Sequence, residues 1–338
     1  MFAKIIQKKD IGRFLYKVFD GFTSHMAVSD LELTEGDMVS IDTEETSYKG
    51  KRQLRIIKSE SLDSAIAKRC MDIPGMHAVC KTIITAMLSE KHIFLRHHAD
   101  ADGICGALAL EAVMPVRMRL QSRKPYYDDS VLREIGMMHN VLVVLIDHGS
   151  TEDSIFALSL LENAGIDYCI IDHHKPVARE LTQQVNTDAY TAGMLAFEVA
   201  QVIRQTDNQL LPAIAGVGDK SEVQAYAQKA GVAQADLKTY ALALDFMAFA
   251  GGKAYHQIIS NKAFADTLAN EAERRITDFL DSAEIEEQQL GDITLVIVQL
   301  AGMDRNFPNA GKVVGYLLNR YEKAFVMGVL EDHIIIRS

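Results

Sequence analysis

Residues 140–147 read NVLVVLID, in which six consecutive apolar residues are followed by an aspartate. A continuous apolar run of this length is typical of a strand buried on both faces of a sheet. The amphipathic stretch TEDSIFALSLLENAG at 151–165 and a second buried strand, IDYCIID at 166–172, follow it, and KHIFLRHH at 91–98 precedes it. This alternation of strands and helices predicts an α/β fold with a doubly wound parallel sheet, in which ligands bind beyond the carboxyl ends of the strands.

The sequence around this α/β segment divides the chain into four predicted parts. The first 60 residues hold strand-length stretches such as MFAKIIQKK and KRQLRIIKS, separated by glycines, which predicts a small β-barrel of the OB type. We expect this barrel to bind oligonucleotides; the alternative is a module that only packs on its neighbour. The parts are an OB-like β domain at 1–60, the α/β domain at 74–260, a connector helix at 261–287 and a smaller C-terminal α+β lobe at 288–338.

The composition is that of a soluble globular protein, with 48% hydrophobic and 24% charged residues. No apolar run reaches the roughly 18 residues that a membrane span needs. None of the four cysteines forms a C-x-x-C pair, so we expect reduced thiols in a cytoplasmic protein without a membrane partner. The formal net charge of -11 argues against broad electrostatic binding of nucleic acid. Two features weaken that argument: the basic stretch YKGKRQLRIIK at 48–58, and the fact that bound cations would offset metal-site aspartates.

Acidic and imidazole residues follow three successive predicted strands and one later apolar turn. They are His98, Asp100 and Asp102 after the first strand, Asp147 after the second, Asp172, His173 and His174 at the third, and Asp219 in LLPAIAGVGDKSE. One aspartate at a strand end is usually a helix N-cap, but three such strand ends converge on one edge of a parallel sheet. Mixed carboxylate and imidazole ligands suit Mn²⁺ or Mg²⁺ better than zinc. Because the set is too large for one ion, it predicts two ions about 4 Å apart, with helix capping plus surface charge as the alternative.

The segments HADADG, VLIDHG, IIDHH and AIAGVGD resemble, in this order, the four signature motifs of the DHH phosphoesterases. The resemblance covers about residues 93–219 closely. The family includes RecJ exonucleases, oligoribonucleases and manganese-dependent pyrophosphatases. The whole-chain layout is most similar to archaeal-type RecJ-like single-strand-specific exonucleases, whose OB-like segment resembles EGDMVSIDTEETSYKGKRQLRI and whose C-terminal lobe resembles FPNAGKVVGYLLNRY.

The resemblance implies a role for each residue of the set. Asp147 would bridge two Mn²⁺ or Mg²⁺ ions, Asp100 would bind one ion with His98 beside it, and Asp102, His173 and Asp219 would complete the other.

His174 would face the scissile phosphate and stabilise charge or assist proton transfer, while Asp172 would orient its neighbours. Arg96 stands where other branches of the family have the motif histidine, four residues before Asp100, and would contact phosphate or face solvent.

The chain departs from the family at its carboxyl end. The family's C-terminal lobe normally ends in a glycine-rich, histidine-containing motif that grips a substrate phosphate, whereas this sequence stops at HIIIRS. The C-terminal lobe is therefore expected to be incomplete, as part of a longer native protein. The alternative is that Arg305, Lys312 or Arg337 replaces the missing grip.

Three functions remain open from the sequence. The leading prediction is an exonuclease that cleaves single-stranded DNA or RNA, which the OB-like segment favours. A phosphoesterase of short oligonucleotides, nucleoside bisphosphates or cyclic dinucleotides is favoured by the net charge and the absent grip. The third is a scaffold with reduced activity that binds replication-complex proteins, the partners implied by the archaeal resemblance.

Overall fold

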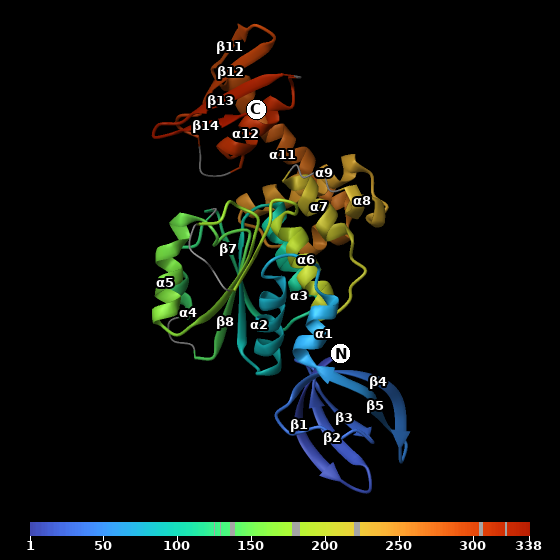
Figure 1. The fold of residues 1–338 in the computed structure, drawn as a ribbon. Coiled ribbons are helices and arrows are strands. Elements are labelled where there is room, and N and C mark those ends of the chain that lie inside the picture. Colours follow the sequence, from blue (N-terminus) through green and yellow to red (C-terminus); the bar gives the residue numbers. More distant parts are fainter. Residues whose placement is uncertain are drawn as a thin grey trace. The chain divides into compact units, whose positions relative to one another are not determined.

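The computed structural model describes the chain apart from residues 125, 129, 136–138, 178–182, 220–223, 304–306 and 322. The chain forms two compact units, Met1–Gln234 and Ala235–Ser338 (Figure 1). The four-part division expected from the sequence remains a prediction. No helix in the described part of the chain has the length and hydropathy that crossing a membrane requires.

Five strands at the amino end of the first unit close into a barrel. Around the barrel the order is β1, β2, β3, β5 and β4, with β4 paired back to β1. The strands are β1 (Phe2–Asp10), β2 (Phe14–Phe19), β3 (Ser24–Ser29), β4 (Met38–Tyr48) and β5 (Lys51–Ser61). Alternate side chains such as Ile5, Val18 and Ile41 fill the interior, where the hydroxyl of buried Tyr16 donates to the carbonyl of Leu31. The closed barrel confirms the predicted OB-like fold of this segment.

A five-stranded parallel sheet forms the centre of the first unit, in the order β10, β9, β8, β6 and β7. The strands are β6 (His92–His98), β7 (Val116–Ser122), β8 (Val141–Ile146), β9 (Asp167–Asp172) and β10 (Gln184–Asn186). All of β8 is buried, as its apolar run predicts. Helices lie on both faces of this sheet, so the predicted doubly wound α/β fold is confirmed (Figure 1).

Helices α2, α3 and α6 pack on one face of the parallel sheet, and α5 packs on the other (Figure 1). The helices of the first unit are α1 (Leu62–Arg69), α2 (Met76–Leu88), α3 (Ala101–Glu111), α4 (Ser130–Ile135), the short 3₁₀ helix η1 (Glu152–Ser154), α5 (Ile155–Asn163), α6 (Ala192–Ile203), α7 (Leu210–Gly218) and α8 (Gln224–Ala230). Gly75, just before α2, has φ 81°, and a Cβ there would lie 1.7 Å from the carbonyl oxygen of Gln184. Only glycine therefore lets the start of α2 approach β10 this closely.

The second unit joins three helices to a small sheet that has a fourth helix on one face. The helices are α9 (Gln234–Phe249), α10 (Tyr255–Ser260), α11 (Lys262–Ser282) and α12 (Ala310–Leu318), and the strands, in sheet order, are β11 (Ile285–Leu290), β12 (Ile293–Gln299), β13 (Ala324–Val329) and β14 (Ile334–Arg337). Helix α11 ends at Ser282 and β11 follows, a strand that the sequence analysis did not predict. The mixed sheet and its helices confirm the expected smaller α+β lobe.

Candidate metal centre

The predicted site residues meet at the carboxyl ends of three neighbouring strands. Strand β6 ends at His98, β8 is followed by Asp147, and β9 ends at Asp172 with two histidines after it. Because β9, β8 and β6 are adjacent and parallel, their ends lie at one edge of the sheet. The topology therefore brings together residues that are far apart in the sequence, as the parallel sheet predicts.

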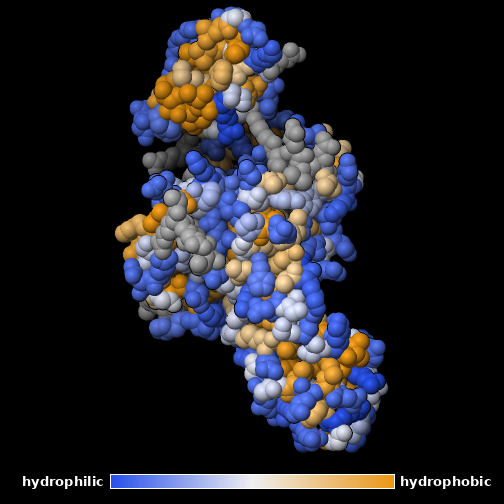
Figure 2. Space-filling view, viewed as in Figure 1, coloured by the Kyte–Doolittle hydropathy of each residue, from blue (hydrophilic) through white to orange (hydrophobic). Residues whose placement is uncertain are grey.

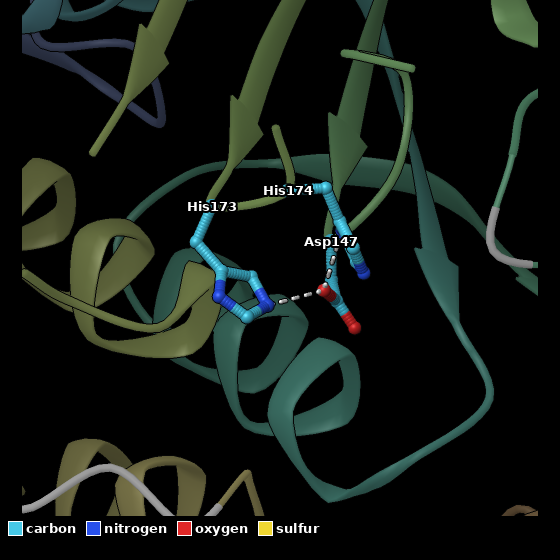
Figure 3. Close-up of side chains that lie close together, drawn as sticks. All are labelled: Asp147, His173 and His174. Carbon is cyan, nitrogen blue, oxygen red and sulfur yellow. Dashed lines mark ion pairs between the residues drawn. The ribbon is translucent and has the colours of Figure 1, made fainter. Parts of the chain in front are cut away.

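Asp147 occupies the middle of this edge. Its backbone has φ 59°, the left-handed region, where aspartate is more tolerable than most residues but still strained by about 1 kcal/mol or more. The backbone N–H donates to the carbonyl of Ile171, at 2.9 Å, which holds this turn against β9. The side chain is 2% exposed and reaches both neighbouring strands: Oδ2 lies 3.3 Å from Nδ1 of His98, and Oδ1 lies 3.3 Å from Nε2 of His173 (Figure 3).

Two groups of side chains in the described residues have ligand atoms close enough to hold a metal ion. One is Asp147 with His173 and His174, and the other is Asp147 with His98 and Asp100; in each, the ligand atoms lie within 4.8 Å of one another. Asp147 is the member that the two groups share. In addition, its buried Oδ1 accepts no hydrogen bond from the described residues, despite its short distance to His173. A buried carboxylate oxygen without a donor is costly unless a cation satisfies it, so the donor set fits a metal ion.

His98 and Asp100 form the β6 side of the site. Nδ1 of His98 lies 2.8 Å from Oδ2 of Asp100, whose other oxygen accepts a hydrogen bond from the backbone N–H of Gly103, at 3.0 Å. Asp100 is therefore both the N-cap of α3 and a member of the polar cluster, so the two interpretations of a strand-end aspartate do not exclude each other. Burial lowers the pKa of His98, but the charges of Asp100 and Asp147 outweigh it and raise that pKa to about 11. The surrounding carboxylates thus favour a positive charge at this position.

Asp102, in the first turn of α3, lies deeper and faces the start of α6. Its carboxylate accepts hydrogen bonds from the backbone N–H groups of Ala192, at 3.0 Å, and Gly193, at 2.9 Å. A Cβ at Gly193 would lie 2.7 Å from the carbonyl oxygen of Asp102, so glycine is needed for this approach. Burial, and then the charge of Asp147, raises the pKa of Asp102 well above its usual value.

His173 lies among three carboxylates. Its Nε2 is 3.3 Å from Asp147, 3.5 Å from Asp219 and 3.8 Å from Asp102. Asp219 directly follows α7, and its side chain is 44% exposed. Burial lowers the pKa of His173, but Asp147 and Asp102 raise it to about 9, which again indicates a position where positive charge is favoured.

Asp172 is completely buried and both of its carboxylate oxygens are occupied. One oxygen lies 2.7 Å from Nδ1 of His174 and accepts the backbone N–H groups of His173 and His174; the other accepts the hydroxyl and backbone N–H of Ser150. Burial raises the pKa of Asp172, but the hydrogen bonds from His174 and Ser150 outweigh it and lower that pKa. The arrangement fixes the His174 ring, and Figure 3 shows His174 beside Asp147.

Two residues that the sequence analysis did not single out support this arrangement. Ser150 holds Asp172, as described above, and the side chain of Asn186 donates to the backbone carbonyl of His174, at 2.8 Å. Asn186 ends β10, so its position at a strand end was a usable signal. Ser150 carries no such signal, because its contact with Asp172 spans 22 residues of sequence.

Arg96, one of the four residues predicted to bind substrate, is inside the first unit. It is 5% exposed, and its guanidinium donates to Asp128, at 3.0 Å, and to Ser130, at 3.3 Å. An internal ion pair therefore occupies this side chain, and its contact with phosphate stays a prediction.

The other three predicted substrate-binding residues belong to the second unit. Lys312 forms an ion pair with buried Asp245 of α9, and the guanidinium of Arg337 lies beside Gly311 and Gly315 of α12. Arg305 falls outside the described residues. Their predicted role at the substrate is untested.

Comparisons with known proteins agree with this geometry. Residues 92–217 match the model of the DHH family, N-terminal domain. An alignment over 193 positions, which covers 44% of this chain, is 32% identical to an uncharacterized protein of Methanocaldococcus jannaschii and spans only 25% of that protein's length.

Two solved structures share the fold. The DHH domain of a member of the s1p family of ribosomal proteins superposes with a TM-score of 0.67 at 23% identity, over 81% of this chain and 83% of that one. Exonuclease RecJ bound to manganese superposes with a TM-score of 0.55 at 16% identity, over 79% of this chain and 83% of that one. Residues 92–217 therefore form a domain of the DHH family, and the chain shares its fold with RecJ.

Proposed function

We propose that this protein hydrolyses phosphodiester bonds in single-stranded nucleic acid, as an exonuclease that uses two divalent metal ions, Mn²⁺ or Mg²⁺. The observation that carries the proposal is the position of Asp147, a buried carboxylate shared by two groups of potential ligands on adjacent strands. A shared carboxylate is what a pair of ions about 4 Å apart would need. The manganese reported for the RecJ structure supports the choice of metal.

The ligands would divide into two sets around Asp147. His98 and Asp100 would complete one, and Asp102, His173 and Asp219 the other, which agrees with the 2.8–3.8 Å distances in each set. Oxygen and imidazole donors of this kind suit Mn²⁺ and Mg²⁺. When bound, such ions polarise the phosphate and make water a stronger acid at neutral pH.

The chain's own contribution to the reaction would centre on His174. Asp172 holds Nδ1 of its ring, so we assign the proton to that nitrogen, which leaves Nε2 for the substrate. From that position Nε2 would exchange a proton with the reacting phosphate group or stabilise its charge. Asp172 itself has no oxygen left for another ligand, which supports a positioning role.

Cationic and aromatic residues at the sheet edge and on the barrel support a polymeric substrate. The loop after β7 carries exposed Arg123 and Lys124 and half-buried Tyr126, at the same edge of the sheet as Asp147. In the barrel, the turn between β4 and β5 presents Tyr48, 56% exposed, beside Lys49. Such residues bind single strands through phosphate contacts and base stacking.

A second function is favoured by one observation, the net charge of -11. A strongly acidic protein gains little from long-range attraction to a polyanion, and this suits a phosphoesterase of dinucleotides or nucleoside bisphosphates. A dinucleotide substrate in the same assay separates the two proposals.

The test is hydrolysis by the purified chain, with Mn²⁺, of 5′-labelled and 3′-labelled single strands of DNA and of RNA, beside a dinucleotide and a blunt duplex. We expect stepwise shortening of a single strand from one end, no cleavage of the duplex, and no activity after chelation. Cleavage of the dinucleotide alone would favour the second function. Binding of a single strand without hydrolysis under any metal would contradict both and favour the scaffold.

A further inference from the structure

The sheet of the second unit has apolar side chains on both faces. Val296, Val298, Ala324 and Val326 point to the core with α11 and α12. The opposite, outer face carries the polar Glu286 and Gln288 of β11 and nine apolar residues of four strands: Leu290, Ile293, Leu295, Ile297, Phe325, Met327, Val329, Ile334 and Ile336. Strands with two apolar faces are typical of sheets covered on both sides.

The register makes the outer face continuous. Leu290 lies opposite Ile293, Leu295 opposite Phe325, Ile297 opposite Met327 and Met327 opposite Ile336. None of the nine residues belongs to the core of this unit or packs against it. Four are largely exposed: Phe325 at 42%, Leu290 and Ile334 at 56% each, and Ile336 at 63%. Figure 2 shows these apolar side chains gathered over the strands of this lobe.

A patch of this kind on a water-soluble surface marks a binding site for another apolar surface. Its size indicates which kind. Three strands about 20 Å long and one about 14 Å long, about 4.8 Å apart, have a footprint of roughly 300–350 Å². A stable dimer needs about 800 Å² per partner, so this face alone is too small for a second copy of the chain. An α-helix about 10 Å wide and about 14 residues long fits it.

The charge at one end of the outer face also limits which kind of molecule can bind there. The turn between β13 and β14 carries exposed Glu331 and Asp332, the latter 2.6 Å from Nδ1 of His333, and Glu286 stands beside Ile297 at the same end. At the other end the exposed Asp292 is paired with Lys323, at 2.9 Å. The occupant should therefore be basic where it meets the acidic turn.

We propose that the outer face of the β11–β14 sheet binds an amphipathic helix of a partner protein, with an apolar stripe on the sheet and basic residues at the acidic turn. The proposal uses no residue of the phosphoesterase site, so the two proposals succeed or fail separately.

The test uses the full chain and a fluorescein-labelled synthetic helix of about 14 residues, with leucines in one stripe and lysines at one end. A scrambled peptide of the same composition, without a stripe, measures binding by charge alone. We expect the double variant Ile334→Ser/Ile336→Ser to bind the striped helix at least about tenfold more weakly, because two isoleucines lose their contacts. Ile57→Ser on β5, where the isoleucine is 50% exposed, is the matched control and should bind like the unmodified chain.

Neutralising the turn with Glu331→Gln/Asp332→Asn should weaken binding of the lysine peptide a few-fold, and leave a peptide with glutamine in place of lysine unaffected. Equal binding of the scrambled peptide, or unchanged binding by the Ile334/Ile336 variant, would overturn the proposal. A dimer in sedimentation velocity that this variant dissociates would also overturn it, and would make a second copy the occupant. The variants change exposed side chains, and unaltered circular dichroism and urea midpoints would establish that they fold.

Discussion

The carboxyl edge of the parallel sheet and the outer face of the β11–β14 sheet depart from ordinary burial in opposite directions. At the edge, Asp102, Asp147 and Asp172 are 2% exposed or less, whereas on the outer face Ile334 and Ile336 are more than half exposed. Buried charge and exposed apolar surface are the two informative exceptions to the usual distribution of residues. Each is unfavourable in the isolated chain and becomes favourable with a ligand: a cation at the edge and an apolar partner on the face.

The largest expected effect is that of Asp147→Asn at the buried edge. Asparagine tolerates the left-handed backbone at this position, so the variant removes charge without adding strain. Because a shared ligand serves both ions, we expect hydrolysis to fall by about a thousandfold or more and metal content to drop. Single-turnover rates and elemental analysis measure the two effects, with exposed Asp207→Asn as the control. Near-normal rates in Asp147→Asn would refute the two-ion site.

The residues of the carboxyl edge could be predicted from the sequence because the apolar stretches directly before them mark their positions. Most site residues stand at or just after the end of an apolar strand, and a parallel sheet brings those ends together whatever the intervening segments do. Asp219, which follows helix α7, is the exception. The partners that decide how each side chain is used could not be predicted in this way. Arg96 meets Asp128 and Lys312 meets Asp245 only through the fold, so their ion pairs leave no pattern in the sequence.

The outer face shows where sequence reasoning stops. DITLVIVQL has apolar residues on both faces of β12, which predicts a strand covered on both sides, but nothing in it says that one cover is absent from the described chain. Strand β11, IEEQQL, is missed for a related reason: its residues favour a helix, and it is a strand because it pairs along β12. At β11, pairing with the neighbouring strand therefore outweighs the local preference for a helix.

The next-largest effects are expected from substitution of the two adjacent histidines, His173 and His174. Nε2 of His173 lies within 4 Å of three carboxylates, whereas Asp172 holds Nδ1 of His174. We expect His173→Ala to lose metal, and His174→Ala to retain most metal while turnover falls about a hundredfold. Elemental analysis of both purified variants decides between the roles. Equal loss of metal would assign His174 to the ligand group with Asp147 and His173 instead.

The expected effects of the metal and of Asp147→Asn on the free energy of unfolding are smaller than those on the rate of hydrolysis. At a concentration of Mn²⁺ 100-fold above its dissociation constant, each bound ion should add about 2.7 kcal/mol to the free energy of unfolding of the unmodified chain. Asp147→Asn should lose that gain and, without metal, should be about 1 kcal/mol more stable than the unmodified chain, because a buried charge is removed. Thermal melts with chelator and with Mn²⁺ measure both. A metal-free variant less stable than the unmodified chain would mean that Asp147 supports the fold without an ion.

The smallest expected effect is on the outer face, and it tests whether that face is open in the free chain. Ile336 is 63% exposed, whereas Val326, on the adjacent strand of the same sheet, is completely buried in the core. Threonine retains the β-branched shape that strands favour, so Ile336→Thr should change the free energy of unfolding by less than about 0.5 kcal/mol. Val326→Thr places a hydroxyl in the core and should cost about 1–3 kcal/mol. Urea midpoints at an unchanged slope measure both. If Ile336→Thr destabilised the chain as much as Val326→Thr, the outer face would already be covered, and the contrast between an open apolar face and a buried polar edge would no longer hold.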